Sequence, residues 1–555
     1  MIPSINTLVN SLPQYGTAPK IAKNDQATCS INNIHTRELD VDAKSIHSSS
    51  EQSSSLSSPR SSPISSTDSI NTHNLKTSHS LDLIIKSLKD PLTDDNIRRH
   101  SELLLSDFDA SLSANAITML ANYNISPTGD EHGSYLAVDL GGSTLRVAVV
   151  DLAPQSESIS RSDRIKVVLE EKWLISNEYK VINRSFFKFI GSKITEIIDK
   201  QETLNPSQTI KVGITWSFPL DTTSHNNGKI RHVSKGYTIG DDVYDKDLKH
   251  LFESILQEEF DLSFDIKSIL NDSLAVYAAG AFLDDKMRLA MVLGTGFNMC
   301  CSLDASKDYM HASKLIDRKM LFNTELSLFG QHLCDDFSTK YDAVIDNRFD
   351  NFKHHFKTYL QPDPNSNLIF QPHELMTSGR YLPELTRLVL ADLIGKKEIF
   401  TNFDSEELNT IETVKYDGFE GELMCFISEC DDFEAVGEKM RDVYHWDKIV
   451  LDSDIAIIKH VIKAIVQRAA FIVANAIIAF FKLLKKYNRS EDLKGLLTIG
   501  YVGSVLNHFH SYRNSVIDYV NMSEDARTCG YKIDLKLIEN SSIIGAAIGA
   551  AYYSK

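Results

Sequence analysis

Apolar runs and amphipathic segments alternate along most of the chain, and their order predicts the fold class. Aliphatic, β-branched runs flank Gly141 and Gly142 and predict two buried strands joined by a tight turn. Similar runs at 166–175 and 209–218 predict two more strands, and the segment 185–200 has the apolar spacing of a helix. Strands that alternate with helices in this way are typical of an α/β fold.

The second half of the chain repeats this arrangement. The segment 289–303 predicts two strands around a second glycine turn, and helical patterns follow at 373–394 and 460–484. Two glycine turns in two halves predict two lobes around one cleft. The most apolar run, 469–481, is shorter than the roughly 20 residues of a membrane-spanning helix, so we expect a buried core helix there.

The N-terminal residues have a different pattern. Serine dominates the stretch 47–69, which lacks the apolar side chains needed to offset the entropy cost of ordering. We therefore expect residues 1–75 to be a disordered Ser-rich segment, with amphipathic helices starting near Thr77 and extending to about residue 113. The Ser-Pro steps in this segment are either phosphorylation sites or parts of a plain solvated linker.

Composition places the chain among large soluble globular proteins. Its 555 residues are 42% hydrophobic, which is enough for more than one domain. Its net charge of −17 gives no indication of a basic surface that would bind nucleic acid or an anionic membrane. The seven cysteines form no C-x-x-C pair and the N-terminus lacks a signal-peptide pattern, so we expect a reducing, cytoplasmic location without membrane insertion.

Both glycine turns contain the residue types that bind phosphate. These residues are Gly141, Gly142, Ser143 and Thr144 in the first turn and Gly294, Thr295 and Gly296 in the second. The backbone N–H groups of such turns can face a phosphate, with Asp139 facing its metal ion. Two structural hairpins would have the same pattern, and neither turn matches a P-loop or a dinucleotide-binding motif.

Two strand ends carry further candidate chemistry. Asp272 follows a strand run and precedes a helix of small residues. It is therefore either part of a helix N-cap or a carboxylate that accepts a proton from a substrate hydroxyl. Gly500, Gly503 and Ser504 lie at a transition from strand to helix, a pattern typical of anion and nucleotide binding.

Taken in order, these motifs resemble those of the hexokinase family of the actin-like sugar kinase superfamily. "DLGGSTLR" and "LGTGFN" are similar to its two phosphate motifs, "LNDSLAVYAAGAF" to its interdomain motif and "GYVGSVL" to its adenosine motif. The resemblance extends from about residue 80 to residue 555. It implies two ribonuclease-H-like lobes, with a small-lobe region at 76–280, a large-lobe region at 281–555 and a last helix that returns to the small lobe.

The resemblance also implies which residues form the site. Its sugar-binding positions are occupied by Ser217, Ser234, Lys235, Asn271, Asp272, Asn298, Glu325 and Glu384. The positions implied for ATP are Gly141, Gly142, Ser143, Thr144, Gly294, Thr295, Gly296, Gly500, Gly503 and Ser504. Asp272 would be the catalytic base, and Asp139 would steer Mg²⁺ through water. Amides and carboxylates suit a sugar because they form paired hydrogen bonds with neighbouring ring hydroxyls.

Some positions depart from the glucose-phosphorylating members of the family. Ser143 and Thr144 stand where those members usually have Thr-Asn, Ser234 where they have Thr, and Pro383 where they have Gly. The whole set of motifs is most similar to the fungal N-acetylglucosamine kinases. This resemblance implies transfer of phosphate from Mg-ATP to the 6-hydroxyl of N-acetylglucosamine, in amino sugar catabolism. A hexokinase acting on glucose, mannose or fructose and a non-catalytic sugar sensor are the alternatives, and the oligomeric state stays open.

Overall fold

The computed structural model describes residues 78–114, 118–123, 126–156, 158–218, 220–231, 233, 237–304, 306, 309, 319–346, 371–488 and 493–554. The predicted Ser-rich segment 1–75 lies outside these residues. The predicted amphipathic helices are confirmed as α2 (His79–Lys89) and α3 (Asp94–Ala114). From there, strands and helices alternate to the last helix, α18 (Ser541–Tyr552), which confirms the α/β fold class.

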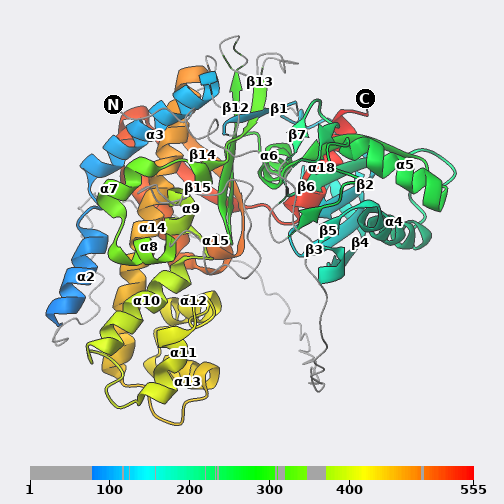
Figure 1. Cartoon of the computed structure of the whole chain (residues 1–555). Helices are drawn as coiled ribbons and strands as arrows, with labels where there is room; N and C mark the ends of the chain where they lie inside the picture. Colours follow the sequence, from blue (N-terminus) through cyan, green and yellow to red (C-terminus); the bar gives the residue numbers. More distant parts are fainter. Residues whose placement is uncertain are drawn as a thin grey trace, which may run out of the picture. The chain divides into compact units, whose positions relative to one another are not determined.

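A five-stranded sheet forms the first lobe, with the strand order β10-β6-β2-β3-β4 (Figure 1). Its strands are β2 (Gly133–Leu140), β3 (Thr144–Leu152), β4 (Ile165–Leu174), β6 (Ile210–Trp216) and β10 (Phe264–Leu270). Strand β3 is antiparallel to β2 and β4, whereas β6 is parallel to β2 and β10. The turn between β2 and β3 is the predicted first glycine turn.

A six-stranded sheet forms the second lobe, with the order β1-β13-β12-β11-β14-β15. Its strands are β1 (Leu120–Asn122), β11 (Met287–Leu293), β12 (Phe297–Asp304), β13 (Lys319–Asn323), β14 (Gly495–Val502) and β15 (Tyr531–Leu537). Strands β13, β12 and β11 are antiparallel neighbours, and β14 and β15 run parallel to β11. Apart from β1, the two sheets therefore share one pattern, an antiparallel three-stranded meander followed by two parallel strands.

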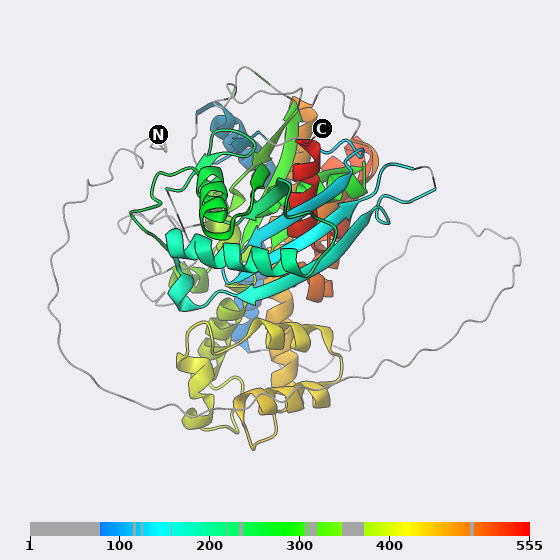
Figure 2. The same cartoon turned by 90° about the vertical axis from the view of Figure 1, so that its right-hand side faces the viewer.

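Helices cover both faces of the five-stranded sheet. Figure 2 shows the red helix α18 alongside its cyan strands, and α4 (Arg184–Asp199) and α5 (Leu248–Phe260) pack on the other face. Because successive side chains of a strand point to opposite faces, β2 contributes Leu136 and Val138 to the α4 and α5 side, and Tyr135 and Ala137 to the α18 side. Asp139 follows the same alternation and lies on the α18 face.

Two helices of small residues join the lobes. Helix α6 (Asp272–Leu283) packs on the six-stranded sheet, α18 packs on the five-stranded sheet, and the two helices pack against each other. Their backbones are so close that a Cβ atom at Gly545 would lie 2.3 Å from the carbonyl oxygen of Ala275. A residue larger than glycine at 545 would therefore push the two helices apart.

The second lobe contains most of the helical mass. Its helices include α7 (Cys334–Phe337), α8 (Lys340–Asp346), α9 (Pro372–Thr377), α10 (Leu382–Gly395), α11 (Ser405–Thr413), α12 (Gly421–Glu429), α13 (Phe433–Tyr444), α14 (Asp452–Tyr487), α15 (Ser504–His508), α16 (His510–Met522) and α17 (Glu524–Cys529). Among the described helices, α14 is long and apolar enough to cross a membrane, but 94% of its most apolar window is buried inside the fold. This burial agrees with the predicted core helix.

The division between the lobes differs from the predicted boundary at residue 76. Helices α2 and α3 pack on α14, and β1 pairs with β13, so these three elements belong with the second sheet. The apolar stripes of α2 and α3 bury residues such as Leu81 and Phe108 in the second lobe's core. Periodicity along the sequence indicates these helices but not the surface on which they pack.

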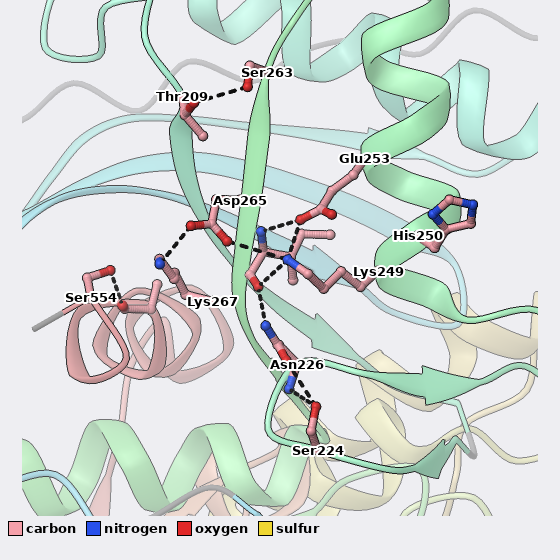
Figure 3. A network of polar contacts seen from close by, with 12 residues as sticks. Thr209, Ser224, Asn226, Lys249, His250, Glu253, Ser263, Asp265, Lys267 and Ser554 are labelled. Carbon is pink, nitrogen blue, oxygen red and sulfur yellow. Dashed lines mark hydrogen bonds and ion pairs between the residues drawn. The ribbon is translucent and has the colours of Figure 1, made fainter.

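Side chains cover the outer edge of the five-stranded sheet, as Figure 3 shows. At Ile266 in β10, the N–H donates to Glu253 Oε1 at 2.9 Å. The Ile266 carbonyl oxygen accepts hydrogen bonds from Asn226 Nδ2 at 2.8 Å and from Lys249 Nζ at 3.1 Å. Unpaired backbone groups at a sheet edge invite slippage and pairing with other chains, so these contacts help to hold β10 in place. Residues Asn271 and Asp272 follow directly at its end.

We expect Gly545→Ala to destabilise the protein by about 1–3 kcal/mol, because the added methyl group collides with α6. Gly395→Ala is the matched control, since at that helical position no atom beyond its own helical turn lies within 4 Å of a Cβ. Urea unfolding of both variants measures the difference. Equal stability of the two variants would contradict the close packing of α6 and α18.

Candidate functional site

The carboxyl ends of the parallel strands bring three predicted segments together in the first lobe. Strand β2 ends before Gly141, β6 before Ser217 and β10 before Asn271. Leu140 pairs with Trp216, and the Ser217 N–H donates to the Leu140 carbonyl at 3.1 Å. Parallel strands end at the same edge of a sheet, where α/β proteins bind ligands.

The first glycine turn is closed by a hydrogen bond from the Gly141 N–H to the Thr144 carbonyl at 2.9 Å. Asp139 precedes it and is 7% exposed. Its Oδ2 accepts hydrogen bonds from Arg146 Nε at 3.0 Å and Nη2 at 2.7 Å. Arg146 is the strand partner of Asp139 across the turn and also reaches Asn540 Oδ1, just before α18, at 3.4 Å. This guanidinium offsets part of the negative charge beside the turn.

Asp272 opens helix α6, and Asn271 is the N-cap residue of that helix. Asn271 Oδ1 accepts the Ser273 N–H at 3.0 Å, and Asp272 Oδ1 accepts the same N–H at 2.7 Å. The capping interpretation therefore applies to both residues. Among the described residues, Asp272 Oδ2 has no hydrogen-bond partner, and the half-buried carboxylate retains an oxygen for a substrate proton.

A network of amides and a carboxylate connects α6 with the second sheet. Asn298 Nδ2 donates to Asn323 Oδ1 at 2.8 Å, and Asn323 Nδ2 donates to Glu325 Oε1 at 2.8 Å. Ser273 Oγ donates to Asn323 Oδ1 at 3.4 Å. Glu325 has a positive φ of 50°, which is uncommon for a residue with a side chain and concentrates at functional sites. The structure thus brings Asn271, Asp272, Asn298 and Glu325 into one polar region.

Three separate segments meet at the second glycine turn. The Gly294 N–H donates to the Gly296 carbonyl at 3.0 Å, and the Gly294 carbonyl accepts the Gly379 N–H at 2.8 Å. Gly503 has a φ of +125°, and a Cβ there would lie 2.1 Å from the Leu293 carbonyl oxygen. Only glycine fits this conformation and this close approach. The loop before α15, with Ser504, therefore lies directly against the second turn.

Gly500 has different surroundings from Gly503. It is buried within β14, where a Cβ would meet the Met287 side chain at 2.9 Å and Ile538 at 3.1 Å. These neighbours are core atoms, so the close packing of β14 accounts for the glycine. The predicted contact of Gly500 with adenosine has no support in this geometry.

Glu384 lies inside the helical part of the second lobe and is 3% exposed. Both of its oxygens pair with Arg387 at 2.7 Å, and Oε2 also accepts the Tyr416 N–H at 2.7 Å. A carboxylate with this many donors has a structural role, and its sugar contact stays a prediction. Ser234 and Lys235 lie outside the described residues, and the next residue with a described position, Tyr237, is buried.

Sequence reasoning missed several residues that the structure places at the site. These are Arg146 at Asp139, Asn323 in the amide network, and Glu374 and Gly379 at the second turn. Arg146 ends the motif DLGGSTLR, and Asn323 lies two residues before Glu325, so their proximity to predicted residues was the available signal. Among the described residues, no group of three or more His, Cys, Asp or Glu side chains is arranged to hold a metal ion.

Comparison with known proteins agrees with this geometry. Two family models, both described as hexokinase, match residues 84–282 and 288–552. N-acetylglucosamine kinase 1 of Candida albicans is 57% identical over 85% of this chain and 94% of its own length. Glucokinase-1 of Saccharomyces cerevisiae is 24% identical over 77% of this chain and 85% of its own length.

The fold is also similar to that of a solved structure. Hexokinase from Schistosoma mansoni, complexed with glucose, superposes with a TM-score of 0.66 over 85% of this chain and 98% of that chain, at 22% identity. With both halves of the chain matched, the chain belongs to the hexokinase family. It is accordingly a sugar phosphotransferase.

We expect Asn323→Ala to raise the KM for the sugar about tenfold, because Asn298 and Glu325 lose their shared partner. The KM for ATP should stay within about twofold of the unmodified protein, since the partners of Asn323 in the amide network, Asn298 and Glu325, are predicted sugar-binding residues. Asn409→Ala, at an exposed position of α11, is the control. Steady-state kinetics with each substrate varied would detect this split, and an unchanged sugar KM would remove Asn323 from the site.

Proposed function

We propose that this protein is an ATP-dependent N-acetylglucosamine kinase that forms N-acetylglucosamine 6-phosphate. The observation that carries this proposal is the 57% identity to N-acetylglucosamine kinase 1 of Candida albicans over nearly the whole relative. Identity to Glucokinase-1 of Saccharomyces cerevisiae is only 24%. The differences from glucose-phosphorylating members at Ser143, Thr144 and Pro383 agree with an altered sugar preference.

Asp272 acts as the general base in the proposed reaction. Its carboxylate takes the proton of the sugar 6-hydroxyl as that oxygen forms its bond to the γ-phosphorus of ATP, and ADP leaves with the electrons of the broken bond. The position of Asp272 at the end of β10 and the start of α6 supports this role, because its second carboxylate oxygen lies outside the hydrogen bond to the Ser273 N–H.

The sugar hydroxyls bind to the amide and carboxylate network of Asn271, Asn298 and Glu325. In this network, the amide nitrogen of Asn298 donates to Asn323, and the amide nitrogen of Asn323 donates to Glu325. These hydrogen bonds set the orientation of each amide and therefore which of its groups faces a ligand. Ser217 adds a hydroxyl beside the end of β2. Ser234, Lys235 and Glu384 belong to the same proposal through the family resemblance.

The two glycine turns bind the phosphates of ATP, and Gly503 and Ser504 lie toward the nucleoside. The convergence of three backbone segments at Gly294 supports this, because close backbone approach offers N–H groups without side-chain obstruction. Asp139 would hold Mg²⁺ through water, and its ion pair with Arg146 suits such an indirect contact. When bound, Mg²⁺ neutralises charge on the phosphates and orients them. The proposed enzyme works in the cytoplasm.

ADP release should be fastest with N-acetylglucosamine when the purified protein is given Mg-ATP and, in separate reactions, glucose, mannose or fructose. The ratio of kcat/KM between sugars is the deciding quantity. Turnover of glucose alone would make the protein an ordinary hexokinase. Sugar binding without turnover of any of the four sugars would make it a sensor.

Asp272→Asn should lower kcat by about 10²–10⁴-fold, because the amide cannot accept the hydroxyl proton. Sugar affinity, measured by calorimetry without ATP, should stay within a few-fold, since the amide keeps a hydrogen-bonding oxygen. Asp285→Asn, an exposed position just after α6, is the matched control. A kcat near that of the unmodified protein would exclude Asp272 as the base.

A further inference from the structure

Three histidines lie together where helix α3 packs against the chain that follows Glu325. His100 belongs to α3, His332 to the short 3-10 helix η4 (Gln331–Leu333) and His373 to α9. His100 and His373 are fully buried, and the His332 side chain is 12% exposed. The rings of His100 and His332 stack with centroids 5.1 Å apart, and the His373 ring lies 6.4 Å from that of His332. The proposed reaction uses none of these three side chains.

His100 and His332 face each other through their Nδ1 atoms, which are 2.8 Å apart. A hydrogen bond between two nitrogen atoms needs one N–H group and one lone pair, so a single hydrogen lies between the two rings. If both Nδ1 atoms carried a hydrogen, the two N–H groups would point at each other. The pair therefore holds at most one positive charge, whereas two separate histidines in water bind one proton each.

The charged groups that face the pair come from α3 and α7. His100 Nε2 lies 2.8 Å from Asp336 Oδ2 and 3.1 Å from Arg99 Nη2, and Arg99 also forms an ion pair with Asp336. His332 Nε2 lies 3.9 Å from Asp107 Oδ2, on the same face of α3. One acidic side chain thus lies beside each ring, and the Arg99 cation opposes the effect of Asp336 on His100.

Two cations of α14 near α3 and α7 form ion pairs of their own. Lys482 Nζ lies 3.3 Å from Asp525 Oδ2, and Arg468 Nη1 lies 2.7 Å from Asp342 Oδ2. The Phe337 ring packs on His100 with ring centroids 4.9 Å apart. Apolar packing of this kind raises the free energy of a charged imidazole.

Burial keeps the three histidines neutral in the folded protein. Desolvation, followed by repulsion from neighbouring cationic groups, lowers the pKa of His100 to about 4 and that of His332 to about 3. Desolvation lowers the pKa of His373 to about 4. Unfolded histidines bind a proton near pH 6.5, so the stability that these residues contribute at neutral pH is lost as the pH falls from about 6.5 toward 4. Partial burial raises the pKa of Asp107, which offsets part of this loss because that carboxyl binds a proton in the folded state.

We propose that the contact between His100 and His332 is an acid-sensitive clasp: one shared hydrogen holds α3 against the segment 331–337, and further protonation opens this contact locally as the pH falls below neutral. Helix α3 belongs to neither sheet and packs through an apolar stripe, so it can separate without breaking a strand pairing. The held segment begins six residues after Glu325, so the clasp makes the surroundings of the polar network sensitive to acid.

Hydrogen exchange of the full-length protein at pH 7 and pH 5 measures this opening, after correction for the pH dependence of the intrinsic exchange rate. Protection of the α3 amides should fall about tenfold more between the two pH values than protection of the amides of α4, a helix of the first lobe whose sequence contains no histidine. Equal losses of protection in α3 and α4 would overturn the proposal.

His332→Asn separates the titration of the pair from its packing. The asparagine amide nitrogen takes a place near that of Nδ1 and can still donate to His100, but the amide binds no proton. The additional loss of α3 protection between pH 7 and pH 5 should therefore shrink about fivefold or more, while protection at pH 7 stays within about threefold of the unmodified protein. His250→Asn, at an exposed position of α5, is the matched control.

His100→Asn tests the other half of the pair and replaces His332→Asn if that variant does not fold. It should reduce the acid sensitivity of α3 in the same way, because the remaining histidine again faces an amide that adapts to its protonation. Full acid sensitivity of α3 in either folded variant would overturn the proposal. An equal reduction in His250→Asn would also overturn it, because the effect would then not depend on the contact between His100 and His332.

Discussion

The contact between helices α6 and α18 is the constraint on which the site depends. Helix α6 starts at the end of β10 in the first sheet, yet it packs on the second sheet, and α18 covers the first sheet from the side that faces α6. The approach of Gly545 to the Ala275 carbonyl allows both contacts at once. At the start of α6, Ser273, next to the proposed base, donates to Asn323 on the second sheet.

The repeated sheet topology explains why each lobe contains a glycine turn with predicted site residues beside it. In each sheet, an antiparallel hairpin carries a glycine turn, and the parallel strand beside it ends next to that turn. The first lobe thereby gathers Asp139, Ser217 and Asp272 at one edge. The second lobe gathers Gly294, Asn298 and Gly503 in the same way. One topological rule, used twice, places the predicted site residues of both lobes at strand ends.

The acidic side chains beside the two glycine turns have different partners. In the first lobe, the acidic side chain beside the glycine turn is paired with Arg146, which lowers the cost of bringing phosphates close to Asp139. In the second lobe, the Glu374 carboxylate accepts the backbone N–H of Phe297, directly after the glycine turn. The overall charge of −17 therefore does not prevent phosphate binding, because the local arrangement of donors decides it.

The sequence by itself determined the elements and their order, because periodicity and turn residues are local signals. It indicated both glycine turns, the α/β class, the core helix within α14 and the carboxylate at the start of α6. Family resemblance added Asn298 and Glu325, which the structure joins through Asn323. Tertiary structure alone decided which surfaces meet. It places α2, α3 and β1 in the second lobe. It also pairs Glu384 with Arg387 and packs Gly500 in the core. These outcomes depend on contacts between residues far apart in the chain, and a single amide or carboxylate has no periodicity that reveals its partner.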